Sequence, residues 1–562
     1  MGASTIGGLS MSEEVSERLR QYQAEQKRPS SKRSYSSGML SRFSRSRQEE
    51  NRITVHIAET IAMQRYLLKL CRALMMYGAP THRLEEYMKY SARVLEIEAQ
   101  FLYIPNSMLM SFDDPQTHTT EVKLVRVNPG LDFGKLRDTH EVYKDVLHDQ
   151  MGVEEATQRL DEIMTSPPRF NKWVLIPFYG LASASVGPFA FGARLIDLPI
   201  AFLLGCLLGV LQLVIAPQSE LYSNVLEVSA AVITSFLARA FGSIHGGRLF
   251  CFSALAQSSI ALILPGYMVL CASLELQSRS IVAGSVRMVY AIIYSLFLGY
   301  GITIGTAMYG IVDRHATSET SCHNPLPEKY QFIAVPIFTF CLIVINQGKW
   351  KQAPVMIVIA FVGFIVNFYA AKRFSGNTQV SNTLGALAIG VMANLYTRLG
   401  KRFENWCLDQ WEDRLRPISK SVTRLFRQRN LRGAKVEALS YEEQTIGDAE
   451  STFVRHKRRI GYSLAATAML PAIFVQVPSG LAVSGSLISG LASADQITGN
   501  GTNGTTVVST TQLELGYQGL NSVVFNVGYS VIQIAIGITV GLFLSALVVY
   551  PFGKRRSGLF SF

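Results

Sequence analysis

Four side chains near the start of the chain are of the types that catalysis or metal binding uses. Cys71, His56, His82 and Glu85 invite comparison with a Cys/His hydrolase, in which a histidine activates a thiol nucleophile. Cys71, however, falls on the apolar face of a predicted helix over 53–77, where a small buried residue is the simpler interpretation. His82 and Glu85 share one helical face, but two such residues on one turn do not make a metal site. We therefore expect no catalytic residue, metal or cofactor, and no enzyme activity.

A second group of ionisable residues lies in or beside long apolar stretches. Glu227 lies one turn and Arg287 two turns into such stretches. Glu275 and Arg279 are four residues apart and could form an ion pair. A charge at the centre of a bilayer costs roughly 2.5–3.5 kcal/mol on insertion scales, so it usually faces a partner or a water-filled path. These four are candidates for substrate binding or ion coupling, with snorkelling to the membrane surface as the alternative for Arg287 and an interfacial position as the alternative for Glu275. Arg239, near the outer end of a span, is expected to snorkel to the membrane surface.

Amide side chains in the apolar stretches extend this group of candidates. They would either line a cavity or form hydrogen bonds between helices. The residues concerned are Gln257, Asn346, Asn367, Asn394, Gln476 and Gln533. Gln257 and Asn394 are the two that we place among the candidates for substrate binding.

Proline and glycine interrupt two of the apolar stretches. Leu264-Pro265-Gly266 breaks one, and Val477-Pro478-Ser479-Gly480 breaks another. Proline lacks the N–H of a helical hydrogen bond, and in lipid the freed backbone groups need protein or water partners. A broken helix inside a bundle is therefore a candidate substrate site, with Pro265, Gly266, Pro478 and Gly480 at its centre, or else only a kink.

The two breaks are followed by similar sequences. Gly301-Ile302-Thr303-Ile304-Gly305 comes after the first, and Gly537-Ile538-Thr539-Val540-Gly541 comes after the second. The same two features in the same order indicate a duplicated half of the chain.

Composition indicates an integral membrane protein. Of the 562 residues, 48% are hydrophobic and only 17% are charged. The net charge of +12 would suit nucleic acid, but the basic residues lie in the N-terminal tail, one long loop and the ends of apolar runs. That distribution fits membrane topology, so we expect contact with lipid and none with nucleic acid. The seven cysteines show no metal-ligand spacing and no disulfide framework.

Apolar runs of about 20 residues are each long enough to span a bilayer. The predicted fold is a mainly α-helical polytopic membrane protein with ten transmembrane helices, preceded by a small α/β domain. The ten spans are 173–192, 197–216, 223–242, 249–273, 281–310, 330–346, 352–371, 381–398, 458–492 and 524–550. Two halves of five spans have opposite orientations, because five is odd, and this is the inverted repeat of many secondary transporters.

The parts outside the spans fix the predicted topology. Residues 1–51 form a basic, serine-rich tail that we expect to be disordered and cytosolic, and 52–168 a soluble domain with helices and two strands near 99–112 and 119–127. In it Gly78 ends a helix and Thr81 is expected to cap the next. Spans 1–8 are expected in 169–346 and 352–398, and spans 9 and 10 in 458–556. Residues 399–457 form a basic loop that we expect in the cytosol. The loop between spans 9 and 10 is expected on the outer side, and it contains the glycosylation sequons of Asn500 and Asn503.

Several of these stretches resemble the threonine/serine exporter family. The resemblance rests on Leu74-Met75-Met76-Tyr77-Gly78-Ala79-Pro80-Thr81-His82-Arg83-Leu84-Glu85, on Leu264-Pro265-Gly266 with Glu275-Leu276 and Gly284-x-x-Arg287, and on 384–398. It covers about 52–556 and includes the order of soluble domain and two membrane halves. Glu275 stands where the bacterial pattern has Asp, and Ser479 separates the second proline from its glycine. The resemblance implies a multi-pass exporter whose substrates are small hydroxy amino acids.

Two classes of function follow. The first is a secondary transporter that moves threonine, serine or similar solutes. Because no nucleotide-binding motif is visible, we expect either an ion gradient to drive it, with proton antiport as one form, or the substrate to move down its own gradient. The second is a non-transporting membrane protein in signalling, mating or membrane organisation. In both, the protein resides in the plasma membrane or an endomembrane with cytosolic termini, and a homo-oligomer is compatible with either.

Overall fold

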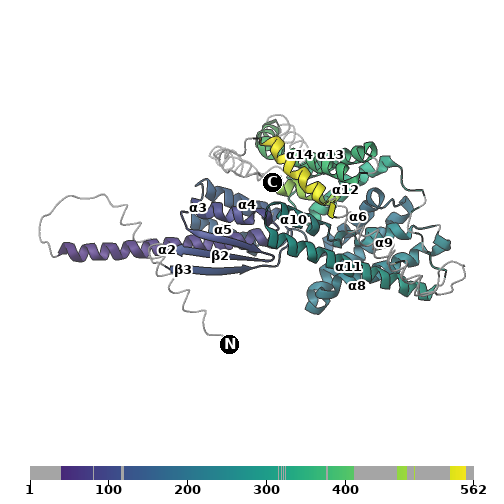
Figure 1. Ribbon diagram of the computed structural model, residues 1–562, viewed down its shortest axis with the longest axis horizontal. Helices are drawn as coiled ribbons and strands as arrows, with labels where there is room; N and C mark the ends of the chain where they lie inside the picture. The colour runs from purple at the N-terminus through teal and green to yellow at the C-terminus, as the bar shows by residue number, and fades with distance from the viewer. Residues whose placement is uncertain are drawn as a thin grey trace, which may run out of the picture. The chain divides into compact units, whose positions relative to one another are not determined.

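The computed structural model describes residues 40–79, 81–114, 119–247, 249–313, 315–317, 319, 322, 324–374, 377–410, 465–476, 487, 491, 532–533 and 535–551. The described chain divides into two compact units (Figure 1). The first comprises the described parts of 1–76, 83–128 and 142–166. The second comprises 77–82, 129–141 and the described residues from 167 onward. The short connection 77–82 therefore belongs to the second unit, although α-helices of the first unit flank it in sequence.

Helices and a small sheet make up the first unit. The helices are α2 (Leu40–Met76), α3 (Leu84–Val94), the end of α4 (Phe133–Leu147) and α5 (Val153–Thr165). The antiparallel strands are β1 (Ala99–Ile104), β2 (Ser107–Asp114) and β3 (Thr119–Arg126), in the order β1-β2-β3. Helix α2 begins at Leu40, inside the segment 1–51 that the sequence predicts to be disordered, and residues 1–39 lie outside the described part of the chain.

The run 99–112, predicted as one strand, is a hairpin of two strands. Pro105 has no N–H to donate to a ladder, and Asn106 adopts a left-handed backbone with φ of 63°. These two residues form the turn, so that Ile104 pairs with Ser107. One face of the sheet, including Phe101 and Met110, is buried in the core of the first unit.

The second unit is built from helices. They are α6 (Lys172–Ala190), α7 (Leu198–Val210), α8 (Glu220–Gly242), α9 (Phe252–Ile260), α10 (Gly266–Gln277), α11 (Ile281–Val312), α12 (Glu328–Ile345), α13 (Ala353–Arg373), α14 (Thr378–Gln410), α17 (Ala465–Gln476) and the apolar helix Ala535–Val549. Helix α6 packs on α7 and α12, α8 packs on α11, and α13 packs on α14 and α17.

Within the described residues, six helices are long and apolar enough to cross a membrane, or seven if the bent pair α9–α10 counts as one span. These seven coincide with the first seven predicted spans. Helix α14 contains the predicted eighth span, α17 lies in the ninth and Ala535–Val549 in the tenth. A mainly helical membrane protein with several spans and a small sheet near its N-terminus is thus confirmed, whereas the number ten and the inverted repeat stay predictions.

Both G-I-T-[IV]-G segments bring helix backbones close together. A Cβ on Gly301 of α11 would lie 2.9 Å from the carbonyl oxygen of Val228 in α8. A Cβ on Gly541 would lie 3.0 Å from the Cβ of Ala386 in α14. Small residues permit such close approach in membrane helix pairs. The two similar sequences therefore make the same kind of contact, with the third and the eighth predicted span respectively.

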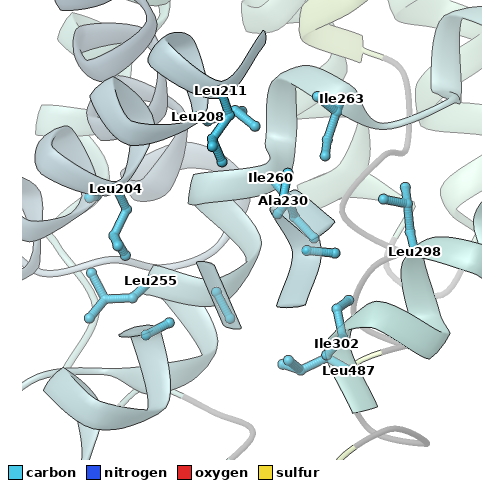
Figure 2. Close-up of a cluster of buried hydrophobic side chains, with 14 of the residues drawn as sticks. Leu204, Leu208, Leu211, Ala230, Leu255, Ile260, Ile263, Leu298, Ile302 and Leu487 are labelled. Atoms are coloured by element: carbon cyan, nitrogen blue, oxygen red, sulfur yellow. The ribbon is translucent and has the colours of Figure 1, made fainter. Parts of the chain in front are cut away.

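A buried apolar cluster connects α7, α8, α9 and α11 (Figure 2). It includes Leu208, Leu255 and Ile302, all with less than 4% of their surface exposed. Ile260, at the end of α9, and Leu487, which follows the second proline break in sequence, belong to the same cluster. Leu487, which follows the second proline break, thus belongs to the same buried cluster as Ile260, which precedes the first break.

Candidate functional site

The first proline break divides one predicted span into α9 and α10, which are inclined by 51°. Helix α9 tightens into a 3-10 turn over Ala261–Ile263, Leu264 is extended, and α10 begins at Gly266. The carbonyl oxygen of Ile263 has lost its helical partner and accepts a hydrogen bond from the hydroxyl of Tyr294 in α11, at 3.0 Å. The helix therefore changes direction at the break, and a side chain of the neighbouring helix α11 supplies the hydrogen bond that the freed carbonyl group needs.

Glu227 is connected to this break by Tyr294, which interacts with both. It is a partly buried residue of α8, and its carboxylate interacts electrostatically with Tyr294. Because Tyr294 donates to Ile263, the predicted candidate Glu227 and the helix break share one neighbour. The sequence contains no pattern that singles out Tyr294 among the aromatic residues of α11.

A buried ion pair lies beyond the break. Nη2 of Arg287 in α11 is 3.1 Å from Oε1 of Glu275 in α10, and the two side chains are 16% and 0% exposed. The suggested pairing of Glu275 with Arg279 is wrong. Helix α10 ends at Gln277, so Arg279 lies past its end, in a turn with φ of 66°, and is exposed. The rule that residues four apart face each other holds only within a continuous helix.

Glu275 has a second hydrogen-bonding partner besides Arg287, and one of its carboxylate oxygens accepts no hydrogen bond from the described residues. The hydroxyl of Thr81 donates a hydrogen bond to Oε1, the same oxygen that Arg287 contacts. The other oxygen, Oε2, is buried and has no hydrogen-bond partner among the described residues. Cys271 and Tyr267, on preceding turns of α10, are hydrogen-bonded to each other and lie within electrostatic range of Glu275. A fully buried carboxylate with an unused oxygen can accept a proton or a donor from a ligand.

Thr81 does not have the role that the sequence predicts for it. Residues Thr81–Arg83 form a 3-10 turn, and α3 begins after it with Arg83 at the N-cap position and no side-chain cap. Thr81 is thus two residues too early to cap α3 and its hydroxyl is used by Glu275 instead. Gly78, predicted to end the preceding helix, does adopt a left-handed backbone with φ of 81°.

The second proline break, residues 477–480, lies outside the described residues. The segment directly before it is described. Phe474 of α17 packs against the same buried apolar cluster of α6 and α12 as Ala261 and Leu262 of the first break. Asn500 and Asn503 also lie outside the described residues, so the structure does not test their glycosylation.

The amide candidates differ in their surroundings. Gln257 is buried and donates to the hydroxyl of Ser253 on its own helix, at 3.0 Å. Gln476 donates to the carbonyl of Gly363 and so joins α17 to α13. Asn394 in α14 is 1% exposed, and neither of its amide atoms has a hydrogen-bond partner within the described residues. No hydrogen bond in the described chain joins Asn394 or Gln257 to Glu275.

Arg239 does not snorkel to the membrane surface as expected. It is fully buried, and it donates to the carbonyl oxygens of Thr306, at 2.9 Å, and Thr317, at 3.2 Å. The loop after α11 folds back over the end of α8, since the N–H of Thr317 also donates to Ser243. The guanidinium therefore finds carbonyl partners without reaching water.

A disulfide, also unexpected from the sequence, links Cys251, directly before α9, to Cys322 in the loop between α11 and α12. The two cysteines are 71 residues apart, which gives no local spacing signal. Asp197 lies beside them, fully buried, and accepts hydrogen bonds from the N–H of Cys251 and of Arg194, both at 2.9 Å. The same end of the second unit thus holds a covalent link and a paired buried carboxylate.

Two residues of the hydrolase hypothesis, Cys71 and Glu85, make contacts that are typical of structural residues. Cys71 is fully buried next to Met75, and burial raises the pKa of its thiol to about 12. A thiol that stays protonated at neutral pH is a poor nucleophile. Glu85 accepts a hydrogen bond from the N–H of Tyr103 and contacts Lys89. Within the described residues, no three His, Cys, Asp or Glu side chains gather as metal ligands would.

Known proteins resemble this chain over most of its length. It is 50% identical, over 92% of its residues, to an uncharacterized protein of Schizosaccharomyces pombe. It is 46% identical over 92% to pheromone-regulated membrane protein 10 of Candida albicans, and 45% identical over 91% to the protein of that name from Candida glabrata. The chain spans 59%, 40% and 56% of the lengths of these three relatives. No solved structure matches it.

The sequence model of the threonine/serine exporter family matches residues 65–309. This segment includes the connection with Thr81, the first proline break, and both members of the ion pair Glu275–Arg287. Over residues 65–309 the chain is therefore similar to the threonine/serine exporter family.

Proposed function

We propose that the protein is a secondary transporter that exports small hydroxy amino acids, such as threonine or serine, in exchange for protons. The family of the matched domain supports transport in general. The substrate class and the coupling ion are our proposal, and the residues around the first proline break support them.

The observation that carries the proposal is the buried pair Glu275–Arg287. An amino acid substrate is a zwitterion, so its site needs an acceptor for the ammonium group and a donor for the carboxylate. Glu275 supplies the first and Arg287 the second: Glu275 lies on α10, which begins at the break, and Arg287 on α11, which packs against α10. A buried pair can exchange its mutual contact for contacts with a bound zwitterion without leaving either charge uncompensated.

Proton coupling follows from the same carboxylate. Oε2 of Glu275 is buried and has no hydrogen-bond partner among the described residues, so the carboxyl group can take up a proton when no substrate ammonium group is bound to it. Glu227, beside Tyr294, is the second candidate for the proton path. Proton-coupled transporters use such intramembrane carboxylates as relays.

The architecture that supports alternating access is the inverted repeat. The stretches next to the two breaks pack against one apolar cluster, and the two G-I-T-[IV]-G segments make equivalent helix contacts. Both findings are what two halves with the same fold would produce. We therefore propose ten spans in two inverted halves, with the substrate held by Glu275 and Arg287 near the end of the helix that follows the first break.

The proposed topology places the N- and C-termini and residues 399–457 in the cytosol. The disulfide Cys251–Cys322 then lies on the opposite, oxidising side, together with Asn500 and Asn503. Disulfides persist on that side and are rare in the cytosol, so the link Cys251–Cys322 supports this topology. The membrane is the plasma membrane or an endomembrane that the secretory pathway supplies.

The test is transport by the purified protein in lipid vesicles. Labelled threonine should move when a pH gradient is applied, and Glu275→Gln should abolish this dependence on the gradient. Glu220→Gln is the matched control, because Glu220 is an exposed residue at the start of α8. Absence of threonine and serine movement under every gradient would overturn the proposal and favour a non-transporting role in signalling, mating or membrane organisation.

A further inference from the structure

The connection Tyr77–His82, between α2 and α3, is shaped by a tight turn. Gly78 has φ of 81°, and a Cβ at this position would lie 2.7 Å from the carbonyl oxygen of Gly130. Only glycine fits such a close approach in a left-handed conformation. The chain therefore makes a tight turn within the residues that belong to the second unit, shortly before Thr81.

Residues 129–141 hold this connection in place. The N–H of Asp132 donates to the carbonyl of Tyr77 at 3.4 Å, and the ammonium group of Lys135 lies 5.6 Å from the centre of the Tyr77 ring. Phe133 is fully buried among residues of α12, α13 and α17, and its N–H donates to the carbonyl of Asn346 at 2.9 Å. Lys349 forms an ion pair with Asp138. The connection is thus fastened to the turn between α12 and α13.

At the end of this connection, Thr81 places a hydroxyl on the carboxylate of the ion pair. It donates to Oε1 of Glu275, the oxygen that Arg287 also contacts. A threonine hydroxyl on a carboxylate beside a guanidinium is the kind of contact that a hydroxy amino acid would make there. Thr81 of the protein itself therefore occupies the position on Glu275 that the hydroxyl group of a substrate would take.

From this geometry we infer that Thr81 gates the transport site on its cytosolic side by competing with the substrate for Glu275. The inference rests on the proposed function and adds the element that closes the site. A buried carboxylate that loses a donor must gain another donor or a proton. Withdrawal of Thr81 is therefore favoured when a substrate or a proton takes its place, which couples gate opening to loading.

The test measures access to Cys271, without any transport. Cys271 lies one turn before Glu275, within electrostatic range of both Glu275 and Arg287, and it is only partly buried. The full-length protein, with Cys206→Ala and Cys407→Ser, would be treated in inside-out vesicles with a membrane-impermeant methanethiosulfonate. Cys71 and Cys341 are buried and Cys251 and Cys322 are joined, so Cys271 is the thiol that the reagent reports.

Thr81→Val keeps the shape of the side chain and removes the hydroxyl. It should raise the rate of Cys271 modification by about tenfold or more, because a hydrogen bond to a charged group shifts an opening equilibrium by at least that factor. Thr81→Ser keeps the hydroxyl and should stay within about twofold of the parent. Thr165→Val is the matched control, since the Thr165 hydroxyl is exposed and bonds only to carbonyls of its own helix.

Equal rates in the parent and Thr81→Val, or equally fast modification of Thr81→Ser and Thr81→Val, would overturn the gate. If Thr81→Val does not fold, Thr81→Cys decides: a short bifunctional thiol reagent should join position 81 to Cys271, and failure to join them overturns the gate. Neither measurement requires transport. A protein that transports threonine with an unchanged labelling rate refutes only the gate, and one that is gated but moves no amino acid refutes only the exporter.

Discussion

The ring of Tyr267 stacks on the ring of Phe474, with 5.0 Å between their centroids and 25° between their planes. Tyr267 is the second residue of α10, directly after the first proline break, and Phe474 lies four residues before Pro478. The two stretches are about 200 residues apart in sequence. The stacking therefore shows that the segments next to the two breaks meet inside the bundle.

Cross-linking can verify this contact. In a chain with Cys271→Ala, the pair Tyr267→Cys and Phe474→Cys should be joined by a short bifunctional thiol reagent, because stacked rings place their attachment points close together. A protease site inserted in 399–457 would separate the chain into two fragments unless the cross-link holds them. Tyr290→Cys with Phe474→Cys is the control, since Tyr290 is exposed on α11. Fragments that separate equally in both variants would contradict the contact.

The ion pair Glu275–Arg287 should behave as a buried pair in thermal unfolding. Arg287→Met leaves Glu275 as an uncompensated buried charge and should lower the free energy of unfolding by about 3–5 kcal/mol. The double variant Glu275→Gln, Arg287→Met should be more stable than Arg287→Met alone. Lys372→Met, which removes one partner of the exposed pair Lys372–Glu328, should change stability by about 1 kcal/mol or less. Purely additive effects at 275 and 287 would show that the two do not interact.

The disulfide should be detectable in the protein isolated with its thiols blocked. Non-reducing peptide mapping should recover Cys251 joined to Cys322. Cys251→Ser should expose one new free thiol and lower stability by up to about 4 kcal/mol, since the bond closes a loop of 71 residues. Cys206→Ser, which changes a cysteine that is already free, should do neither. Recovery of Cys322 as a free thiol in the parent protein would refute the link and its support for the proposed topology.

Cys71 should resist alkylation over the physiological pH range. Burial raises the pKa of its thiol to about 12, so the folded protein keeps the proton when an unfolded chain would lose it. The resulting contribution to stability is complete below the ordinary pKa of about 8.5 and is lost as the pH rises from there toward 12. Pulse alkylation at pH 7 to 9 should therefore label Cys71 only in denaturant, and Cys71→Ala should weaken the alkaline loss of stability. Rapid labelling of the folded protein at pH 7 would revive the hydrolase hypothesis.

Glycosylation tests the predicted outer loop. If Asn500 and Asn503 lie on the side opposite the cytosol, a glycosidase should increase the gel mobility of the parent protein and leave a double Asn→Gln variant unchanged. A protease that reaches 399–457 from outside intact cells would reverse the proposed topology.

Local sequence was sufficient for the positions of the helices. Each of the first seven spans is a run of apolar residues, and burial in lipid depends on composition within that run and not on remote partners. The break at Pro265 and the left-handed turn at Gly78 were predictable for the same reason, because both follow from the backbone chemistry of single residues. Charged side chains within apolar stretches likewise made Glu275 and Arg287 candidates from sequence alone, without knowledge of their partners.

Partners were decided only by the tertiary structure. Glu275 pairs with Arg287 because α10 ends before Arg279, and its second donor is Thr81, 194 residues earlier in the chain. Cys251 meets Cys322 because the loop after α11 folds back over the end of α8. Such contacts depend on how distant segments pack, which no spacing along the sequence encodes. The sequence thus determined which residues carry charge into the membrane, and the packing of α10, α11 and Tyr77–His82 decided what those charges bind.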